Sequence, residues 1–270
     1  MNFAEYRQLD AVNWSTLREM AVSPKHYHHR LTTPRPDTGP MAFGRAVHTS
    51  VLEPDRLPLE YAIWSGGRRG TNAHKEWQAQ QGGRQELSEG EYETCLDVRD
   101  AVHAHPVAAN LLRGCQFETT VEWTMTGIDC KCRPDAVKKR TLIDLKTART
   151  IDARKFGRNA YDLGYFGQMA FYAEGLAVST GVGDWEAFLI AVEADQPHDV
   201  GVFHIDPDSL YAAGVKAHEL LDRVAECRES GQWPGRYPQQ QDLTLPAWEF
   251  VEDNDAELVI SGLKSAEGFV

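Results

Sequence analysis

The sequence lacks the features that would place the chain in a membrane or outside the cell. No apolar run approaches the ~18 residues that a membrane-spanning helix requires. The opening residues, MNFAEYRQLDAVNW, contain no basic segment followed by an apolar one, so we expect no secretory signal peptide. The 5 cysteines are odd in number and widely spaced, which favours reduced thiols over a disulfide framework. These absences predict a cytoplasmic protein.

Positive charge is also scarce, because 28 Lys and Arg residues face 40 Asp and Glu residues and the formal net charge is −12. Taken alone, this balance argues against nucleic acid as a partner, since phosphate groups are bound mainly by Lys and Arg. A site that uses divalent metal ions needs carboxylates, however. Two stretches are also locally basic, GGRRGTNAHK (66–75) and RTIDARKFGR (149–158). They are either solvated loops or parts of a DNA-binding surface.

The first 113 residues carry mainly helical signals. Helices are predicted over residues 13–21, 23–31, 41–54 and 87–106. The first has Asn13 or Ser15 as its N-cap. The last begins with Ser88, followed three residues later by Glu91, which is the pattern of a capping box.

Strand signals begin at about residue 115. Three alternating runs rich in β-branched and aromatic residues predict an antiparallel meander, over 117–126, 129–138 and 141–147. After them we expect a helix, two strands and a long helix, over 163–181, 184–194, 199–206 and 207–230. This order predicts an α/β fold with a helical N-terminal part.

The domain organisation follows from the same change of pattern. We expect a single domain over residues 1–235, helical over 1–113 and built around a catalytic sheet core over 114–235. A Pro-, Gln- and acid-rich C-terminal extension over 236–270 completes the chain.

Two aspartates and a lysine fall on the second and third predicted strands. Asp144 and Lys146 are two residues apart and share one strand face, whereas Ile143 and Leu145 point to the other face. If the two strands pair, Asp135 lies near Asp144. A cation between the two carboxylates would relieve their repulsion, and oxygen ligands suit Mg²⁺ or Mn²⁺. The alternative is a surface hairpin with one solvated ion pair.

The spacing of these residues has the form of the PD-(D/E)xK nuclease motif, with Pro134-Asp135 and Asp144-Leu145-Lys146 as its two parts. Three flanking segments resemble those of RecB and RecE nuclease domains. WSTLREMAVSP resembles their opening helix, GRAVHTSVLEP their G-x-x-x-H helix and QMAFYAEG their Q-x-x-x-Y helix. The order holds over about residues 13–205. The chain therefore resembles the RecE-like, lambda-exonuclease-type phage DNA exonucleases.

The resemblance implies a restriction-endonuclease-like core, in which a mixed central sheet is flanked by helices. It implies a Mg²⁺-dependent exonuclease that degrades linear double-stranded DNA from its ends, 5′→3′ and processively. Such an enzyme releases 5′-mononucleotides and leaves 3′ single-stranded tails for a single-strand annealing protein of the RecT or beta type. One or two Mg²⁺ ions per site, replaceable by Mn²⁺, are expected, as is a ring of three or four copies. The setting would be a bacterial or phage-infected cell, with no membrane partner.

The resemblance also implies a metal-binding set. Asp135, Asp144 and the backbone carbonyl of Leu145 would bind the metal, and His48 would join them as the histidine of the G-x-x-x-H helix. Lys146 would orient and activate the attacking water.

A second set would contact DNA. Gln168 and Tyr172 lie one helical turn apart and would line the site as catalytic residues against the scissile strand. Binding of DNA, including its 5′-phosphate, would fall to Ser15, Arg18, Arg45, Arg68 and Arg69. Glu118 and Glu122 are candidate further acids, although an exposed strand face explains them equally well.

Three other readings stay open. The chain could be a RecB- or Cas4-like repair nuclease of other polarity, although its cysteines do not show the cluster pattern of Cas4-like proteins. Cys130 and Cys132 share a strand face and could bind zinc, but no second pair stands at ligand spacing. A catalytically inactive DNA-binding module on the same fold is the third reading.

Overall fold

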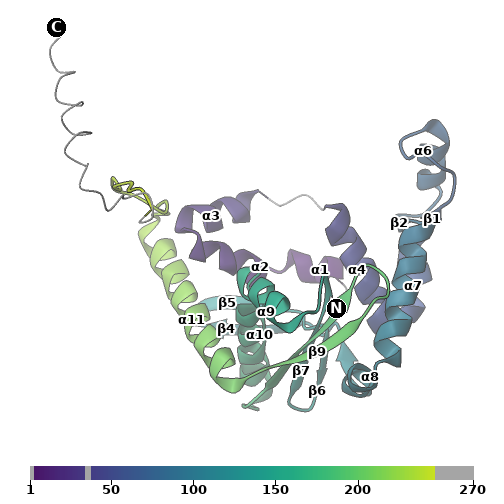
Figure 1. Cartoon of the computed structure of the whole chain (residues 1–270). Coiled ribbons are helices and arrows are strands. Elements are labelled where there is room, and N and C mark those ends of the chain that lie inside the picture. Colours follow the sequence, from purple (N-terminus) through teal and green to yellow (C-terminus); the bar gives the residue numbers. More distant parts are fainter. Residues whose placement is uncertain (1–2, 34–37, 247–270) are drawn as a thin grey trace, which may run out of the picture. The chain divides into compact units, whose positions relative to one another are not determined.

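The computed structural model describes residues 3–33 and 38–246 (Figure 1). It separates into one compact unit, Met1–Arg236, and a second, Tyr237–Val270. The described residues of the second unit, 237–246, contain no helix or strand. Most of the predicted C-terminal extension lies outside the described residues. Within the described part of the chain, every helix is too short or too polar to cross a lipid bilayer.

The N-terminal part is mainly helical, as predicted. Its helices are α1 (Phe3–Gln8), α2 (Trp14–Leu17), α3 (Pro24–Thr32), α4 (Gly39–Leu52), α5 (Leu57–Glu60), α6 (Asn72–Ala79), α7 (Glu89–Ala104) and α8 (Pro106–Leu112). Asn13, rather than Ser15, caps α2, because its side chain accepts a hydrogen bond from the backbone N–H of Thr16. Ser88 and Glu91 form the predicted capping box of α7.

One small sheet in this part was not predicted. Strands β1 (Tyr61–Trp64) and β2 (Gln85–Ser88) pair in parallel, and α6 lies in the segment between them. Each strand has four residues, which is too short for an alternating pattern to stand out from the surrounding helical signals.

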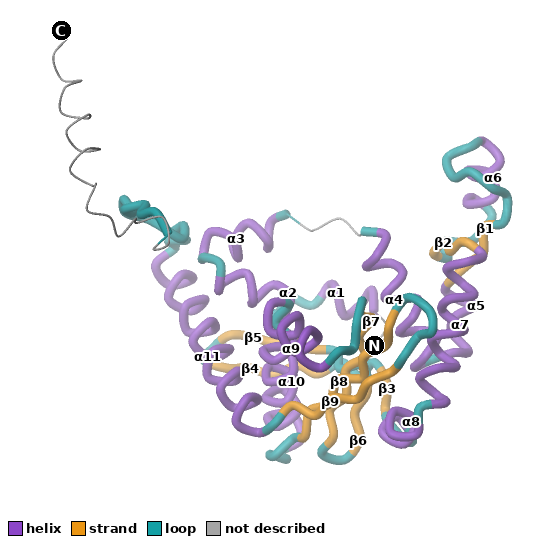
Figure 2. The backbone as a smooth tube through the Cα atoms, in the orientation of Figure 1, coloured by secondary structure: helices purple, strands orange, loops and turns teal. Residues whose placement is uncertain are grey.

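A five-stranded mixed sheet forms the centre of the main unit (Figure 2). Its strand order is β3-β6-β7-β8-β9, with bounds Gln116–Phe117, Ala136–Lys138, Thr141–Ala148, Glu186–Glu193 and Val200–Ile205. Strands β7 and β8 run parallel, and the other neighbouring pairs are antiparallel. Helices α9 (Ala153–Asp162) and α10 (Tyr165–Thr180) connect β7 to β8, and α11 (Pro207–Ser230) follows β9. The predicted α/β fold with a mixed central sheet flanked by helices is confirmed.

The predicted three-stranded meander is wrong. Strands β4 (Val121–Met125) and β5 (Ile128–Cys132) form a separate hairpin, and only β6 joins β7. The continuous strand expected over 129–138 breaks around Pro134, which has no N–H to donate to a strand partner. The strand expected over 117–126 breaks at Glu118, whose φ of 51° lies in the left-handed region.

The sheet separates two apolar layers. On β7, Leu142 packs in the layer that contains α10 residues such as Met169, whereas Ile143 and Leu145 pack in the layer that contains Val47 of α4. This alternation agrees with the predicted strand periodicity. It turns Asp144 and Lys146 toward the side covered by α10.

Helix α2 packs closely on the beginning of α10. The indole Nε1 of Trp14 donates a hydrogen bond of 2.9 Å to the backbone carbonyl of Gly164. An added Cβ at Gly167 would lie 2.1 Å from Cη2 of Trp14, so only glycine allows this approach. The contact fixes the first turns of α10.

Gly167→Ala should therefore lower the free energy of unfolding by about 1–3 kcal/mol, because the new methyl group displaces a packed indole. Thermal and urea denaturation would measure the change. Gly157→Ala on α9 is the matched control, since nothing lies within 4 Å of its added Cβ. That change should be neutral or stabilise the protein by up to about 1 kcal/mol. Equal stability of the two variants would contradict the packing argument.

Candidate metal centre and active site

Asp144 is a buried carboxylate, 1% exposed, in the middle of the central strand β7. Its Oδ2 lies 2.5 Å from Nζ of Lys146 on the same strand face. From α10, Nε2 of Gln168 donates a 2.7 Å hydrogen bond to Oδ1 of Asp144. Gln168 Oε1 in turn accepts from Lys146 Nζ at 3.2 Å. The three side chains thus form a closed network in which each fixes the other two.

The charges of this network follow from burial and pairing. Burial raises the pKa of Asp144 to about 6, although Lys146 acts in the opposite direction. Burial alone would lower the pKa of Lys146, but Asp144 and Asp135 together raise it above its ordinary value. The ammonium also lies 4.5 Å from the ring centroid of Tyr165. Lys146 is therefore a positively charged hydrogen-bond donor in this arrangement.

Asp135 stands directly before β6, and the strand register brings it beside Asp144. Ala136 pairs with Ile143 in an antiparallel register, so Asp135, which precedes Ala136, lies opposite Asp144, which follows Ile143. The backbone N–H of Leu145 donates a 2.7 Å hydrogen bond to Oδ2 of Asp135. The structure thus brings the two aspartates together, as expected, although the hairpin that carries them is shorter than predicted.

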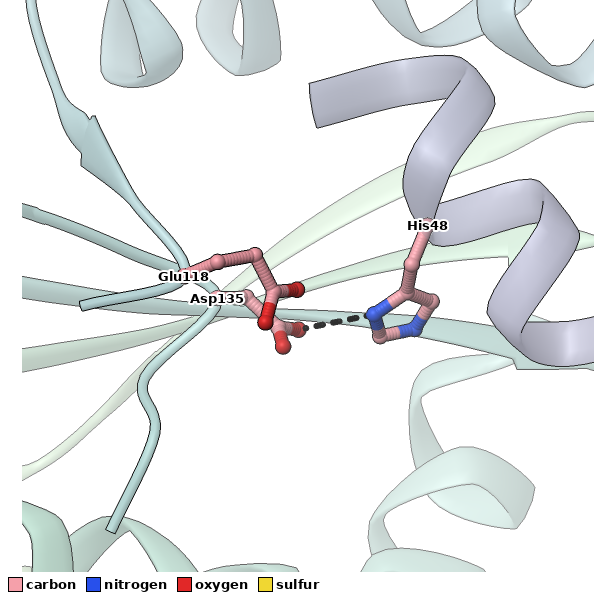
Figure 3. Close-up of side chains that lie close together, drawn as sticks. All are labelled: His48, Glu118 and Asp135. Atoms are coloured by element: carbon pink, nitrogen blue, oxygen red, sulfur yellow. Dashed lines mark ion pairs between the residues drawn. The ribbon is translucent and has the colours of Figure 1, made fainter. Parts of the chain in front are cut away.

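A second group of ligands meets Asp135 from the other side. One potential ligand atom from each of His48, Glu118 and Asp135 lies within 4.8 Å of the others (Figure 3). His48 extends from α4, and its Nδ1 is 3.4 Å from Oδ2 of Asp135. Burial would raise the pKa of Asp135, but the imidazole of His48 holds it below its usual value. Burial and the charge of Asp135 raise the pKa of Glu118 to about 7.

From the sequence, Glu118 and Glu122 were equally placed candidates for a further acid of the site. In the structure, only Glu118 lies in the group around Asp135. Oε2 of Glu118 accepts a 2.7 Å hydrogen bond from Nε of Arg133, whose side chain is 7% exposed. Glu122 is exposed on β4 and lies outside the group around Asp135. No sequence signal distinguishes Glu118 from Glu122, because the strand break at Glu118 is visible only in the structure.

The group opens into a cavity of about 530 Å³ that His48, Glu118, Asp135 and Tyr172 help to line. Basic side chains are numerous in its lining, despite the acidic chain: Arg7, Arg30, Arg45, Arg56, Lys131 and Arg133. Four carboxylates, those of Glu53, Glu60, Glu118 and Asp135, share this lining, and Arg56 and Arg133 are paired with glutamates among them. The lining is therefore mixed in charge, with more basic than acidic side chains, unlike the chain as a whole.

Three of the predicted DNA-contacting residues lie at or near the site. Ser15 and Arg45 line the cavity. Ser15 Oγ donates to Oδ1 of Asn13 at 2.8 Å, and Arg45 Nη2 donates to Oε1 of Gln85 at 3.5 Å. Arg18 instead holds the loop before α10, with Nη1 2.5 Å from the carbonyl oxygen of Leu163.

The other two predicted residues are not brought to this cavity. Arg68 and Arg69 lie between β1 and α6 and are absent from the cavity lining. The guanidinium of Arg69 pairs with Glu86 at 2.5 Å and with Glu91 at 3.0 Å. These pairs give Arg69 a local role in holding the small β1–β2 sheet.

Cys130 and Cys132 share one face of β5, as predicted, and both are buried. Within residues 3–33 and 38–246, the group around Asp135 is the only one that assembles three or more His, Cys, Asp or Glu ligands. The zinc hypothesis therefore finds no further ligand for this cysteine pair in the described part of the chain.

The family of the chain is shown by sequence comparison. Residues 13–241 match the family described as a PDDEXK-like domain of unknown function (DUF3799). The chain belongs to this family, and the resemblance to the PD-(D/E)xK superfamily is confirmed. Comparison with curated proteins gave no significant match.

One solved structure has the same fold, and two further structures align over part of the chain. The crystal structure of a predicted exonuclease from Eubacterium rectale aligns with 90% of this chain and 93% of its own, with a TM-score of 0.62 and 14% identity. The alkaline exonuclease LHK-Exo from Laribacter hongkongensis aligns with 69% of this chain and 90% of its own, with a TM-score of 0.29 and 13% identity. The crystal structure of LHK-Exo in complex with dAMP aligns with 69% of this chain and 92% of its own, with a TM-score of 0.29 and 12% identity.

The cysteine environment predicts slow thiol chemistry on β5. Burial raises the pKa of Cys130 to about 12 and that of Cys132 well above its ordinary value, so few thiolates form at pH 8. We expect iodoacetamide to label this pair at least ~10-fold more slowly than the half-buried Cys115 in the native protein. Mass spectrometry of the labelled peptides would measure the rates. Equally fast labelling of Cys130 would contradict the burial described here.

Proposed function

We propose that the chain is a metal-dependent exodeoxyribonuclease that degrades linear double-stranded DNA. One observation carries this proposal: Asp135, Asp144 and Lys146 meet beside a cavity lined by six basic side chains. Family membership supports nuclease chemistry, since the motif residues are present and gathered in one place. An inactive DNA-binding module would have no need of a buried aspartate–lysine pair at this position.

The donor set fits a hard divalent cation. Carboxylates and an imidazole are available, and such oxygen-rich sites suit Mg²⁺ or Mn²⁺. His48, Asp135, Asp144 and the backbone carbonyl of Leu145 would hold one or two ions. A bound ion would polarise the scissile phosphate and lower the pKa of a water molecule.

The protein side chains have distinct parts in the proposed reaction. Lys146 is held by Asp144 and Gln168, so its ammonium can donate to the attacking water or to a phosphate oxygen without first reorganising. Tyr172 lines the cavity wall, where the scissile strand would pass.

DNA binding is proposed for the residues nearest the cavity. Ser15 and Arg45 would contact the backbone of the entering strand, and Arg18 would do so from the adjoining helix end. Arg68 and Arg69 could add contacts only from the separate β1–α6 segment, and Arg69 would have to exchange its carboxylate partners for phosphate.

The finer features of the proposal depend on the family resemblance. They are 5′→3′ polarity, processive release of 5′-mononucleotides, a ring of three or four copies around DNA, and 3′ tails passed to a single-strand annealing protein. The rival is a RecB- or Cas4-like repair nuclease of other polarity, and end-labelled DNA separates the two.

Lys146→Ala should lower the rate of nucleotide release from linear duplex DNA with Mg²⁺ by at least ~100-fold, because it removes the fixed donor. DNA binding, measured by fluorescence anisotropy, should stay within about 3-fold of the wild type, since the cavity arginines remain. Lys216→Ala on the exposed surface of α11 is the control and should keep full activity. An equal loss of binding and cleavage would make Lys146 a structural residue.

Duplex DNA labelled at either the 5′ or the 3′ end tests polarity. We expect early release of the 5′ label, persistence of the 3′ label on a single strand, and no release in EDTA. Early release of the 3′ label would favour the rival nuclease. Failure of Mg²⁺ and Mn²⁺ to support any nucleotide release would remove the enzyme hypothesis and leave the inactive DNA-binding module.

A further inference from the structure

The second basic stretch of the sequence, residues 149–158, runs into helix α9 and contributes no residue to the cavity lining. In the structure this helix presents an exposed surface formed by Arg154, Arg158 and Tyr161, which we call the α9 face. We propose that the α9 face binds the phosphate backbone of intact duplex DNA next to the active site. This inference rests on the proposed nuclease function, but it uses none of the residues assigned to that function above.

The α9 face points away from the protein core. Phe156 and Ala160 are buried and form the inner side of the helix. Arg154, Arg158 and Tyr161 are spaced by four and then three residues, so they share the opposite side. Tyr161 is 68% exposed, which is a large exposure for an aromatic residue. Both guanidinium groups and the phenol are therefore accessible to a ligand.

The cations of this segment have no acidic partner in the described part of the chain. Asp152, which precedes the helix, instead accepts a 3.0 Å hydrogen bond from the backbone N–H of Lys155. Arg69 and Arg133, by contrast, are paired with glutamates. The basic side chains without an ion pair to described residues are Arg149, Arg154, Lys155 and Arg158. A phosphate can bind here without breaking an existing pair, in a chain whose net charge of −12 otherwise disfavours DNA.

The end of α9 is joined to the active site by short contacts. Gly164 follows α9, and its carbonyl accepts the indole hydrogen bond of Trp14, which lines the cavity (Figure 1). The next residue, Tyr165, places its ring 4.5 Å from Nζ of Lys146. Only four residues thus separate exposed Tyr161 from a ring that contacts the catalytic lysine. A duplex that lies along α9 is therefore held beside the residues that would cleave it.

The chemistry of the α9 face suits a DNA backbone better than a protein partner. Arginine and tyrosine side chains donate hydrogen bonds to phosphate oxygens, and such contacts carry no sequence preference, as an enzyme that degrades any duplex requires. Four helical residues rise about 6 Å, so Arg154 and Arg158 can reach different phosphate groups. The face contains a single large aromatic residue and no apolar patch around it, whereas the centre of a protein interface is mainly apolar.

Replacement of both arginines tests the α9 face by DNA binding alone. Arg154→Gln combined with Arg158→Gln keeps good helix formers but removes two charges. With EDTA present to prevent cleavage, the affinity for a blunt linear duplex should fall about 10-fold at low salt. The slope of log K against log [salt] should become shallower by about 2, because two phosphate contacts are lost. Tyr161→Ala should weaken binding about 3-fold without changing the slope, since its hydroxyl carries no charge. Fluorescence anisotropy over a salt series measures both quantities.

Lys216→Gln combined with Arg223→Gln is the matched control, because both residues are exposed on α11 and the change in net charge is the same. This variant should keep the wild-type affinity and slope. Equal losses in the two double variants would show an effect of overall charge and overturn the α9 face.

Wild-type affinity and slope in a folded α9 double variant, with its fold checked by thermal unfolding, would also overturn the inference and favour an acidic protein segment as the ligand of this face. The nuclease proposal would stand in that case, because nucleotide release with Mg²⁺ tests it separately. A wild-type protein that releases nucleotides but shows no duplex binding would overturn the α9 face alone. Absence of both binding and release would overturn both proposals.

Discussion

A single hydrogen bond, from the backbone N–H of Leu145 to Oδ2 of Asp135, joins the parts on which the site depends. It ties the residue before β6 to the middle of β7 and holds two carboxylates side by side. Such proximity is unfavourable for like charges, so the arrangement needs compensation. Lys146 supplies it for Asp144 and His48 for Asp135, each from a different layer of the protein.

The helices on the two sides of the sheet position different side chains of the site. Helix α10 delivers Gln168 to Asp144, and its first turns are fixed by Trp14 through a hydrogen bond and a glycine contact. Helix α4 delivers His48 from the opposite side of the sheet. The position of the site at the meeting of both layers explains why residues from distant parts of the chain converge there. The sheet between them fixes their relative placement.

Sequence periodicity predicted the half of the site that lies on one strand. Asp144 and Lys146 share a face because side chains alternate, and the capping box at Ser88 marked the beginning of α7. The extent of the hairpin was not predictable by alternation, because the missing N–H of Pro134 breaks a run that still alternates in polarity. No sequence pattern predicts that Glu118 adopts a left-handed backbone conformation. Its place beside Asp135 could therefore be seen only in the tertiary structure.

Pairing of β7 with β8 has a consequence for motion. The register with β8 runs along the whole of β7 and includes Asp144 and Lys146, so the backbone that carries them is costly to open and this part of the site should persist through most local fluctuations. Glu118 and Arg133 lie instead at breaks between strands, where fewer backbone bonds resist displacement. One wall of the site is therefore rigid and the other compliant, so the Glu118 side can adjust to the shape of a ligand without displacing the Asp144–Lys146 pair.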